Sequence, residues 1–371
     1  MKKLQLTKST KSTFTTCGIV VVLAAVMMIL DGTGSLSNSM QGFLVPLCIY
    51  IIMAVSLNLV VGILGELSLG HAGFMCVGAY TSAVFSKCMV GTITFAPLRF
   101  GIAILVGAAC AAVFGILIGI PVLRLKGDYL AIVTLAFGEI IKNICNVIIL
   151  GRDSAGFQIS FDKVSDLNLA EDGEIIIKGA QGISGTPNDS SFLVGVILVL
   201  ITLIVVLNLI NSRTGRAIMS IRDNRIAAES MGIDITKYKL MVFTISAAFA
   251  GAAGALYSHN LSTLTATGDK FNYNASIMIL VYVVLGGIGS IRGSVIATIV
   301  LYVLQEQLRF MQNLRMLVYA VVLIAVMIYN WSPKMQEYRA VWKMKFMDKF
   351  GGVLSKFKRK TGDGSGGERS V

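Results

Sequence analysis

The sequence predicts an all-α fold, a polytopic bundle of membrane helices, from three observations. Hydrophobic residues make up 55% of the 371 residues and charged residues only 14%, and the mean hydropathy is +0.77. Soluble domains use about 25% charged residues. The apolar residues gather in runs that approach the roughly 20 residues a helix needs to cross a bilayer. The charges sum to +12, but they collect at the chain ends and in short loops, which indicates membrane topology rather than a nucleic-acid partner.

Ten apolar segments are the expected membrane helices. They cover residues 14–30, 43–61, 72–90, 100–122, 128–149, 191–210, 240–258, 275–291, 294–308 and 316–331. The first is followed by Asp31-Gly-Thr-Gly-Ser, which offers no clear small-x-small cleavage site, so we expect a retained span. The pair on either side of Arg292 can be two short spans or one broken span. The six cysteines lack paired spacing and indicate membrane-buried residues, not disulfides or metal ligands.

Positive charge predicts which side each loop faces, because basic loops stay in the cytoplasm. Residues 1–13, the interval 211–239 and the tail 332–371 carry four, six and ten basic residues against none, three and four acidic ones, and we expect them inside. Residues 151–190, with seven acidic and three basic residues, should lie outside. Two cytoplasmic termini require an even number of crossings of the domain 14–331: ten, or eight if two segments are re-entrant. The tail should be disordered at its end and meet membrane lipid with its basic part.

Two stripes of small residues predict close packing of helices. Small side chains repeated every four residues let helix backbones approach each other where lipid provides no hydrophobic drive. We expect the stripes to serve packing rather than transport. They are Gly107, Ala111, Gly115 and Gly119 in one segment and Ala247, Gly251 and Ala255 in another.

The segment that starts at Asp128 carries a polar stripe. At 100° per residue, its polar side chains fall within an arc of roughly 100°. A charge deep in lipid costs about 2.5–3.5 kcal/mol even on the lenient insertion scale, so the stripe should face protein or water. Glu139 and Lys142, three residues apart, can pair. The stripe is either the wall of a translocation path or a polar seam between helices, and both interpretations stay open. It consists of Asp128, Glu139, Lys142, Asn143 and Asn146.

Two glycine-rich stretches predict interrupted helices, and irregular backbone at membrane depth survives only against protein or a watery cavity. In residues 58–80 the expected break carries Glu66, Ser68 and His71, so Glu66 and His71 are further candidates for the path, although a lone histidine is more often a structural hydrogen-bonder. The second stretch is LGGIGSIRG at residues 285–293; it lacks the spacing and the flanking strand of a nucleotide-binding loop. The glycines of the first stretch are Gly62, Gly65, Gly70, Gly73 and Gly78.

The interval 211–239 predicts a short polar helix. Asp223 or Asn224 can cap it, and Gly232 can end it in the left-handed conformation. A helix of about two turns needs a surface to dock against. The interval is therefore either a docking element for a cytoplasmic partner or an ordinary connecting loop with a helical turn. Ile226, Ala227 and Met231 would form its apolar face, bordered by Arg222, Arg225 and Glu229.

No catalytic motif is present. The sequence contains no P-loop, no H-E-x-x-H metal motif and no nucleophile elbow, so we expect no enzymatic activity and no cofactor bound by this chain. If the protein moves a solute uphill, another subunit hydrolyses ATP or an ion gradient is used.

Five spaced motifs resemble the inner-membrane permeases of branched-chain amino acid ABC importers, and the longer of the two permease subunits more closely. The similarity runs in order over about residues 54–310 and leaves out the first 40 residues and the basic tail. The motifs are LNLVVGILGELSLGHAGFMCVGAYTSAV, LRLKGDYLAIVTLAFGEIIKNICN, QGISGTP, RAIMSIRDNRIAAESMGIDITKYKLMVFTISAAFAGAAGALY and VLGGIGSIRGSVIAT.

The resemblance implies a coupling helix at residues 222–232 that sits in a cleft of the ATPase. The general importer motif begins E-A-A and places a glycine four residues after its glutamate; here Gly232 is retained, but the glutamate is displaced to Glu229. That departure leaves the individual role of Glu229 open. The residues that the resemblance assigns to coupling are Arg222, Asp223, Asn224, Arg225, Ala227, Ala228, Glu229, Met231 and Gly232.

Membership in such an importer implies several partners: a second permease subunit in a heterodimer, two cytoplasmic ATP-binding subunits that use the ATP, and an external substrate-binding protein. The implied location is the bacterial inner membrane, and the implied substrate is leucine, isoleucine or valine. The same family includes importers of urea and short amides. An ion-coupled secondary transporter with Glu139 or Asp128 as coupling carboxylate is the alternative from another class; it explains the membrane charges but not the basic helical loop.

Overall fold

The computed structural model describes residues 8–32, 38–125, 127–153, 156–162, 167, 173–266, 270–308 and 314–331. Residues 1–7 of the predicted basic N-terminus (1–13) and all of the tail 332–371 lie outside the described residues. Contacts divide the chain into two units, Met1–Val303 and Leu304–Val371. The first unit holds every predicted site residue.

Each apolar segment predicted from the sequence is a helix. The apolar pattern does not mark four further helical elements: a π-helical turn, the 3-10 turn Gly179–Gln181 and two short polar helices, α7 and α8. The helices are α1 (Lys8–Gly32), α2 (Asn38–Asn58) with the π-helical turn Leu59–Leu64, α3 (His71–Met89), α4 (Ala96–Val122), α5 (Asp128–Val147), α6 (Phe192–Asn211), α7 (Arg213–Asp223), α8 (Arg225–Ser230), α9 (Ile235–Ser258), α10 (Tyr273–Gly286), α11 (Ile291–Gln307) and α12 (Arg315–Trp331).

Fewer helices than predicted are long and apolar enough to cross a membrane. Among the described residues, length and composition qualify five: Gln41–Leu64, Ala96–Val122, Asp128–Val147, Phe192–Asn211 and Ile235–Ser258. The two helices around Arg292, α10 and α11, have 14 and 17 residues. They rise about 21 and 26 Å at 1.5 Å per residue, less than the roughly 30 Å of a hydrocarbon core. Ten crossings therefore stay a prediction.

Helices α4 and α9 pack on the two predicted stripes of small residues. A Cβ atom placed on Gly251 would lie 2.4 Å from the Cβ of Ala111 and 2.6 Å from the carbonyl oxygen of Gly107, and one on Gly115 would lie 2.7 Å from the Cβ of Ala247. Such distances leave no room for a side chain. The prediction that the stripes serve close packing is confirmed.

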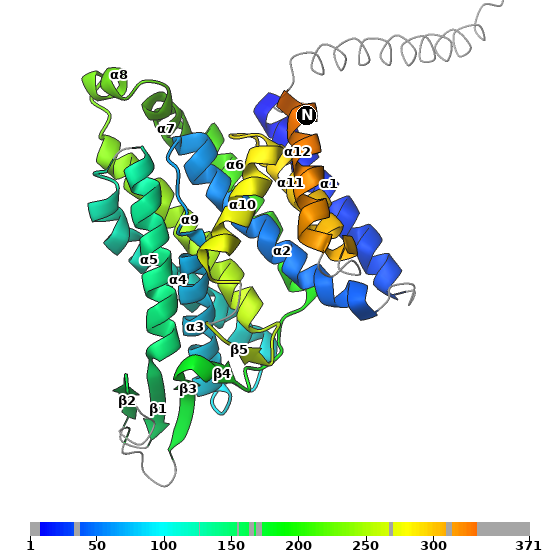
Figure 1. Cartoon of the computed structure of the whole chain (residues 1–371), viewed down its shortest axis with the longest axis vertical. Helices are drawn as coiled ribbons and strands as arrows, with labels where there is room; N and C mark the ends of the chain where they lie inside the picture. The colour runs from blue at the N-terminus through cyan, green and yellow to red at the C-terminus, as the bar shows by residue number, and fades with distance from the viewer. Residues whose placement is uncertain are drawn as a thin grey trace, which may run out of the picture. The chain divides into compact units, whose positions relative to one another are not determined.

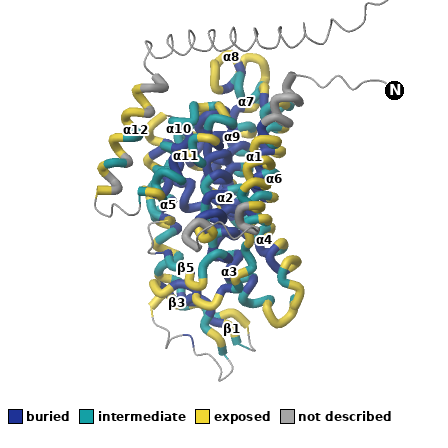
Figure 2. Tube along the Cα trace, turned by 90° about the vertical axis from the view of Figure 1, so that its right-hand side faces the viewer, coloured by how far each residue is buried: buried dark blue, intermediate teal, exposed yellow. Residues whose placement is uncertain are grey.

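The helical unit carries different structures at its two ends. Helices α7 and α8 lie at one end, and the strands β1 (Ile149–Asp153) and β3 (Glu174–Lys178) lie at the other, in both of the perpendicular views (Figures 1 and 2). The chain connects the two ends through α6, which runs between the strands and α7. This separation agrees with the prediction that residues 151–190 and 211–239 face opposite sides.

Strands in the 151–190 region correct the all-α prediction. Strand β1 pairs antiparallel with both β2 and β3, with an irregularity at Leu150 and Gly151, and β4 pairs with β5. A chain that leaves a helix must still satisfy its backbone N–H and C=O groups, and the β-branched residues of segments such as Glu174–Lys178 favour a ladder. The strands are β1 (Ile149–Asp153), β2 (Gly156–Ser160), β3 (Glu174–Lys178), β4 (Ile183–Ser184) and β5 (Thr263–Leu264).

Burial distinguishes central from peripheral helices. In an 18-residue apolar window of Gln41–Leu64, 94% of the residues are buried within the chain, whereas the share is 28% in the corresponding windows of Ala96–Val122 and Asp128–Val147. Figure 2 shows this as a dark interior along α2 flanked by exposed surface on α1 and α4. Helix α5, which carries the polar stripe, is therefore largely uncovered by the rest of this chain.

Candidate functional site

Helices α7 and α8 form the predicted polar helical segment. The side chain of Asn224 accepts a hydrogen bond from the backbone N–H of Ala227 at 3.1 Å, and α8 follows it. Gly232 has a φ of +80° and ends the turn in the left-handed region. The predicted cap and stop are confirmed, with Asn224 rather than Asp223 as the cap. Asp223 instead accepts a hydrogen bond from the neighbouring Arg222 guanidinium at 2.9 Å.

The outward side of α8 is uncovered by the rest of the described chain. Ile226 and Met231 are 79% and 83% exposed, and Figure 1 shows α8 projecting at the end of the bundle. Ala228 lies on the opposite side, only 3% exposed, in a cluster with Ile221 of α7 and Ile235 of α9. The methyl group of Ala228 therefore packs in the chain's own core, and its assignment to coupling stays a prediction. Ala227 is exposed, as predicted.

The first predicted helix break lies between α2 and α3. The π-helical turn Leu59–Leu64 ends at Gly65, whose φ is +81°, and regular structure resumes only at His71. The second break separates α10 from α11, with Gly287 and Gly289 at φ values of +97° and +82°. Both interruptions occur where the glycine-rich stretches predicted them.

The two breaks contact each other through Asn58. Its side-chain oxygen accepts from the N–H of Gly289 at 2.9 Å, and its amide nitrogen donates to the hydroxyl of Ser294 at 2.7 Å. Asn58 is fully buried, so both bonds satisfy polar groups that water cannot reach. A Cβ atom on Gly62 would lie 2.3 Å from the nitrogen of Gly289, which is why no side chain fits there. The sequence-based prediction did not single out Asn58. The feature that could have indicated it is a single amide side chain inside an apolar run.

Two basic side chains from the α7–α9 segment reach the first break. A terminal nitrogen (Nη1) of Arg222 donates to the carbonyl oxygen of Gly62 at 3.0 Å. The Lys239 ammonium forms an ion pair with the carboxylate of Glu66, and the two side chains are only 4% and 16% exposed. Glu66, a predicted path residue, is thus bound to the polar segment 211–239. Lys239 was counted among the basic residues of that interval, but no role was predicted for it.

His71 lies in the chain's own interior. It is 2% exposed, and its Nε2 atom lies 2.7 Å from the hydroxyl of Ser56 on α2. The N–H of the next residue, Ala72, donates to the hydroxyl of Ser276 on α10. These contacts favour the structural alternative for His71, a hydrogen-bonding group where α3 begins.

Glu139 and Lys142 form the predicted pair on α5, with 2.5 Å between Oε2 and Nζ. The other carboxylate oxygen of Glu139 accepts from the N–H of Tyr273 at 2.8 Å, at the first turn of α10. A carboxylate at that position complements the positive end of the helix dipole. The contacts make Glu139 part of a seam between α5 and α10.

The rest of the stripe lies beside the packing face of α5. That face consists of Ala131, Thr134, Gly138 and Ile141, all buried. At 100° per residue the stripe is centred roughly a quarter-turn or slightly more away from it. Asp128 and Asn143 are exposed, and Asn146 is half-buried with a side-chain oxygen that no described residue hydrogen-bonds. Asp128 and Asn143 therefore point away from the rest of the described chain, whereas the side-chain oxygen of Asn146 is buried within it.

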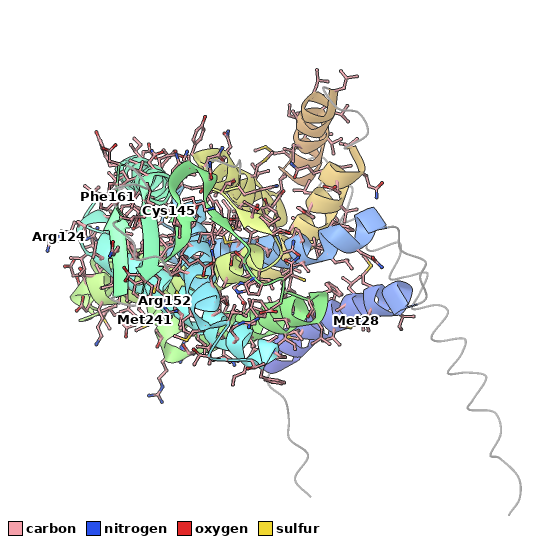
Figure 3. All side chains as sticks on the ribbon, turned by 90° about the horizontal axis from the view of Figure 1, so that it is seen from below. Met28, Arg124, Cys145, Arg152, Phe161 and Met241 are labelled. Atoms are coloured by element: carbon pink, nitrogen blue, oxygen red, sulfur yellow. The ribbon has the colours of Figure 1, made fainter. Side chains whose placement is uncertain are left out.

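A cavity of about 550 Å³ lies between α3, α4, α5 and the strands. Its walls are apolar and include Val77, Phe114 and Ile144, and none of the predicted path residues lines it. Figure 3, viewed from the strand end, labels Cys145, another of its lining residues, together with Arg152 and Phe161 near the strands. Among the described residues no group of three or more His, Cys, Asp or Glu side chains could hold a metal ion.

Comparisons with known proteins define the class. The family described as "Branched-chain amino acid transport system / permease component" matches residues 39–327. The high-affinity branched-chain amino acid transport system permease proteins LivM of Salmonella typhimurium and Escherichia coli are each 36% identical to the chain over 295 residues, 77% of this chain and 67% of theirs. The permease protein LivH of Salmonella typhimurium is 23% identical over 257 residues, 68% of this chain and 79% of its own. No solved structure matches the chain.

A multi-helix membrane protein with a match of this extent is a transport permease. More particularly, the chain belongs to the family of permease components of branched-chain amino acid transport systems. Its greater identity to LivM than to LivH agrees with the predicted resemblance to one of the two permease types.

Proposed function

We propose that this chain is a permease subunit of a bacterial inner-membrane ABC importer for leucine, isoleucine and valine. A second permease subunit completes the translocation path, an external binding protein delivers the substrate, and two cytoplasmic ATPases drive the cycle. The family match over residues 39–327 carries the proposal. The chain itself binds no ATP and serves as a transport subunit.

The α8 segment is the docking element for one ATPase. It is short, capped at Asn224 and uncovered at Ile226 and Met231, so it presents a small apolar surface held in place by the buried cluster around Ala228. An apolar surface of this kind stabilises an interface when it fills a matching cleft. The cluster fixes the direction of α8, and the charged residues Arg225 and Glu229 border the surface.

The α7–α8 end is the cytoplasmic end in this proposal. Helix α1 begins there as well, since Nε of Arg292, beside the second break, donates to the hydroxyl of Thr16 at 2.5 Å. The basic N-terminus and the basic interval 211–239 then share one side, as the positive-inside rule requires. The helices α1 to α6 and α9 to α12 make the ten crossings, α10 and α11 being shortened by the breaks.

The polar stripe of α5 borders the path or the seam with the second permease. The support is its position: it is polar, lies beside the packing face and is only partly covered by this chain. Asp128 and Asn143 are the members that face outward, Asn146 is half-buried, and Glu139 and Lys142 are bound to each other.

Uptake into membrane vesicles tests the class and the substrate together. Radiolabelled leucine should enter only when ATP and the binding protein are present, and should continue when the ion gradient is collapsed at constant ATP. Unlabelled isoleucine or valine should compete, whereas urea and acetamide should not. Loss of uptake on collapse of the ion gradient alone would establish a secondary transporter, and competition by urea or acetamide but not by valine would reassign the substrate.

A further inference from the structure

We propose that Lys239 and Arg222 form a two-point link that transmits movement of α8 to the broken helix between α2 and α3. The inference rests on the proposed docking of α8 to an ATPase and deepens it by naming the residues behind the docking surface. Lys239 holds the carboxylate of Glu66, and Arg222 holds the carbonyl of Gly62. The two anchor points are four residues apart at the break.

At the α8 end of the link, helices α7, α8 and α9 are packed as one body. Arg222 is in the last turn of α7, Lys239 is near the start of α9, and α8 lies between them in the chain. Ile221, Ala228 and Ile235 join these three helices in one buried cluster. A displacement of α8 by a partner must therefore carry Arg222 and Lys239 with it, because a packed cluster of this kind does not deform continuously.

At the break, the link holds backbone that has left the helical hydrogen-bond pattern. In a continuous α-helix the N–H of Glu66 would bond the carbonyl of Gly62, but it bonds the carbonyl of Val60 at 3.2 Å instead. The carbonyl of Gly62 is then free of the helical ladder and accepts from Arg222. Arg222 therefore supports the geometry of the break itself.

Hydrogen bonds connect the first break to α5, which carries the polar stripe, and to the second break, between α10 and α11. The N–H of Leu69 donates to the hydroxyl of Thr134 on α5 at 3.0 Å. Asn58, one helical turn before Gly62, holds Gly289 of the second break. Movement of residues 62–70 thus reaches α5 on one side and the α10–α11 junction on the other. These contacts form a continuous chain of hydrogen bonds and packed helices from α8 to the polar stripe.

A buried ion pair is a poor device for stability alone. An apolar pair of similar volume is often as stable or more stable, because burying two charges removes them from water. What the pair provides is a fixed direction and distance between α9 and the break. Lys239 and Glu66 are therefore positioning residues, and they act on transport through the break.

The test removes the Lys239–Glu66 point of the link without leaving a buried charge unpaired. In the Glu66→Leu/Lys239→Met double variant both charges are absent, and in Glu66→Lys/Lys239→Glu the pair is reversed. Lys237→Met is the matched control, because Lys237 lies on the same turn region of α9 but is exposed. The whole importer, in liposomes, is assayed for ATP hydrolysis with and without leucine-loaded binding protein, for co-purification of the ATPase and for melting temperature.

We expect the apolar double variant to keep its melting temperature and its ATPase, and to lose stimulation by the loaded binding protein by about fivefold or more, the range of coupling between sites. The reversed pair should recover most of the stimulation, and Lys237→Met should match the wild type. Full stimulation in the apolar double variant would overturn the proposal. So would a loss that accompanies an equal loss of melting temperature or ATPase, since the pair would then act on folding only. A wild-type permease that binds no ATPase would instead refute the proposed function.

Discussion

Glu139 illustrates what a charged side chain needs inside a helical bundle. One of its oxygens contacts Lys142 on the same helix, and the other accepts from the N–H of Tyr273 on α10. With 25% of its side chain exposed, Glu139 is partly shielded from water, so both contacts matter more than they would at a surface. The residue thereby connects two helices in addition to any role beside a path.

Replacing Glu139 by leucine should expose this double role. The change leaves Lys142 without its partner and the N–H of Tyr273 without an acceptor, at a cost of about 1–3 kcal/mol. Membrane insertion should persist, and leucine uptake should fall. Glu139→Gln, which keeps one acceptor oxygen for Tyr273, should lose less stability.

Thermal unfolding of the purified importer and uptake in vesicles measure the two effects. Ile140→Leu is the matched control, because Ile140 is 53% exposed on the neighbouring face of α5 and should be silent. Wild-type uptake by a stably assembled Glu139→Leu importer would remove Glu139 from any pathway.

At the scale of single elements, the sequence correctly predicted the features that depend only on adjacent residues. Asn224 and Gly232 predicted the start and stop of α8 because a cap and a left-handed turn depend on adjacent residues. Which side of α8 faces inward depends on α7 and α9, so the burial of Ala228 could not be read from six helical residues. The strands in the 151–190 loop were missed for a similar reason: Ile149–Asp153 becomes a strand only with partners on both sides.

A pair of tryptophan substitutions separates the two faces of α8. Ala227→Trp enlarges the exposed face and should leave the permease folded while weakening ATPase binding by roughly tenfold or more, the effect of about 1–3 kcal/mol of overpacking. Ala228→Trp enlarges the buried face and should destabilise the permease itself. Co-purification of the ATPase and thermal unfolding distinguish the two outcomes.

Gly232→Val tests the turn that directs α8. A β-branched residue at a φ of +80° carries a strain of about 1–2 kcal/mol. The permease should reach the membrane, and the ATPase should co-purify poorly or hydrolyse ATP without responding to the loaded binding protein. Full association and full stimulation in both Ala227→Trp and Gly232→Val would show that α8 is only a connector.

Helix α4 offers a matched comparison for packing. Gly115→Leu places a side chain against Ala247 of α9, where a Cβ atom alone would lie at 2.7 Å, whereas Gly101 has no atom within 4 Å of such a position. Gly115→Leu should therefore lower the yield of folded protein by overpacking, and Gly101→Leu should not. Size-exclusion profiles in detergent compare the two, and equal profiles would mean that α4 and α9 do not pack on this stripe.

At the scale of the whole molecule, the sequence predicted the order of helices and both breaks but not the contacts between distant segments. Lys239 and Glu66 are 173 residues apart, and Asn58 and Ser294 are 236 apart. Hydrophobic periodicity and glycine placement say nothing about such pairs, because each partner is compatible with many neighbours until the bundle is assembled. The candidate site was therefore predicted as separate pieces, and the fold joins them at the α7–α8 end.

The sidedness of the molecule follows from these joined pieces and can be measured directly. Phe161, 63% exposed near the strands, and Lys237, exposed at the start of α9 but outside α8, lie at opposite ends of the unit. In a variant without its natural cysteines, Phe161→Cys should react in whole cells with a membrane-impermeant maleimide, and Lys237→Cys should react only after permeabilisation. Lys237 is preferred to residues of α8, since a docked ATPase would shield those. Basic loops of a membrane protein stay on the cytoplasmic side. Labelling of Lys237→Cys in intact cells would therefore show the opposite orientation, in which α8 lies outside and no cytoplasmic ATPase can reach it.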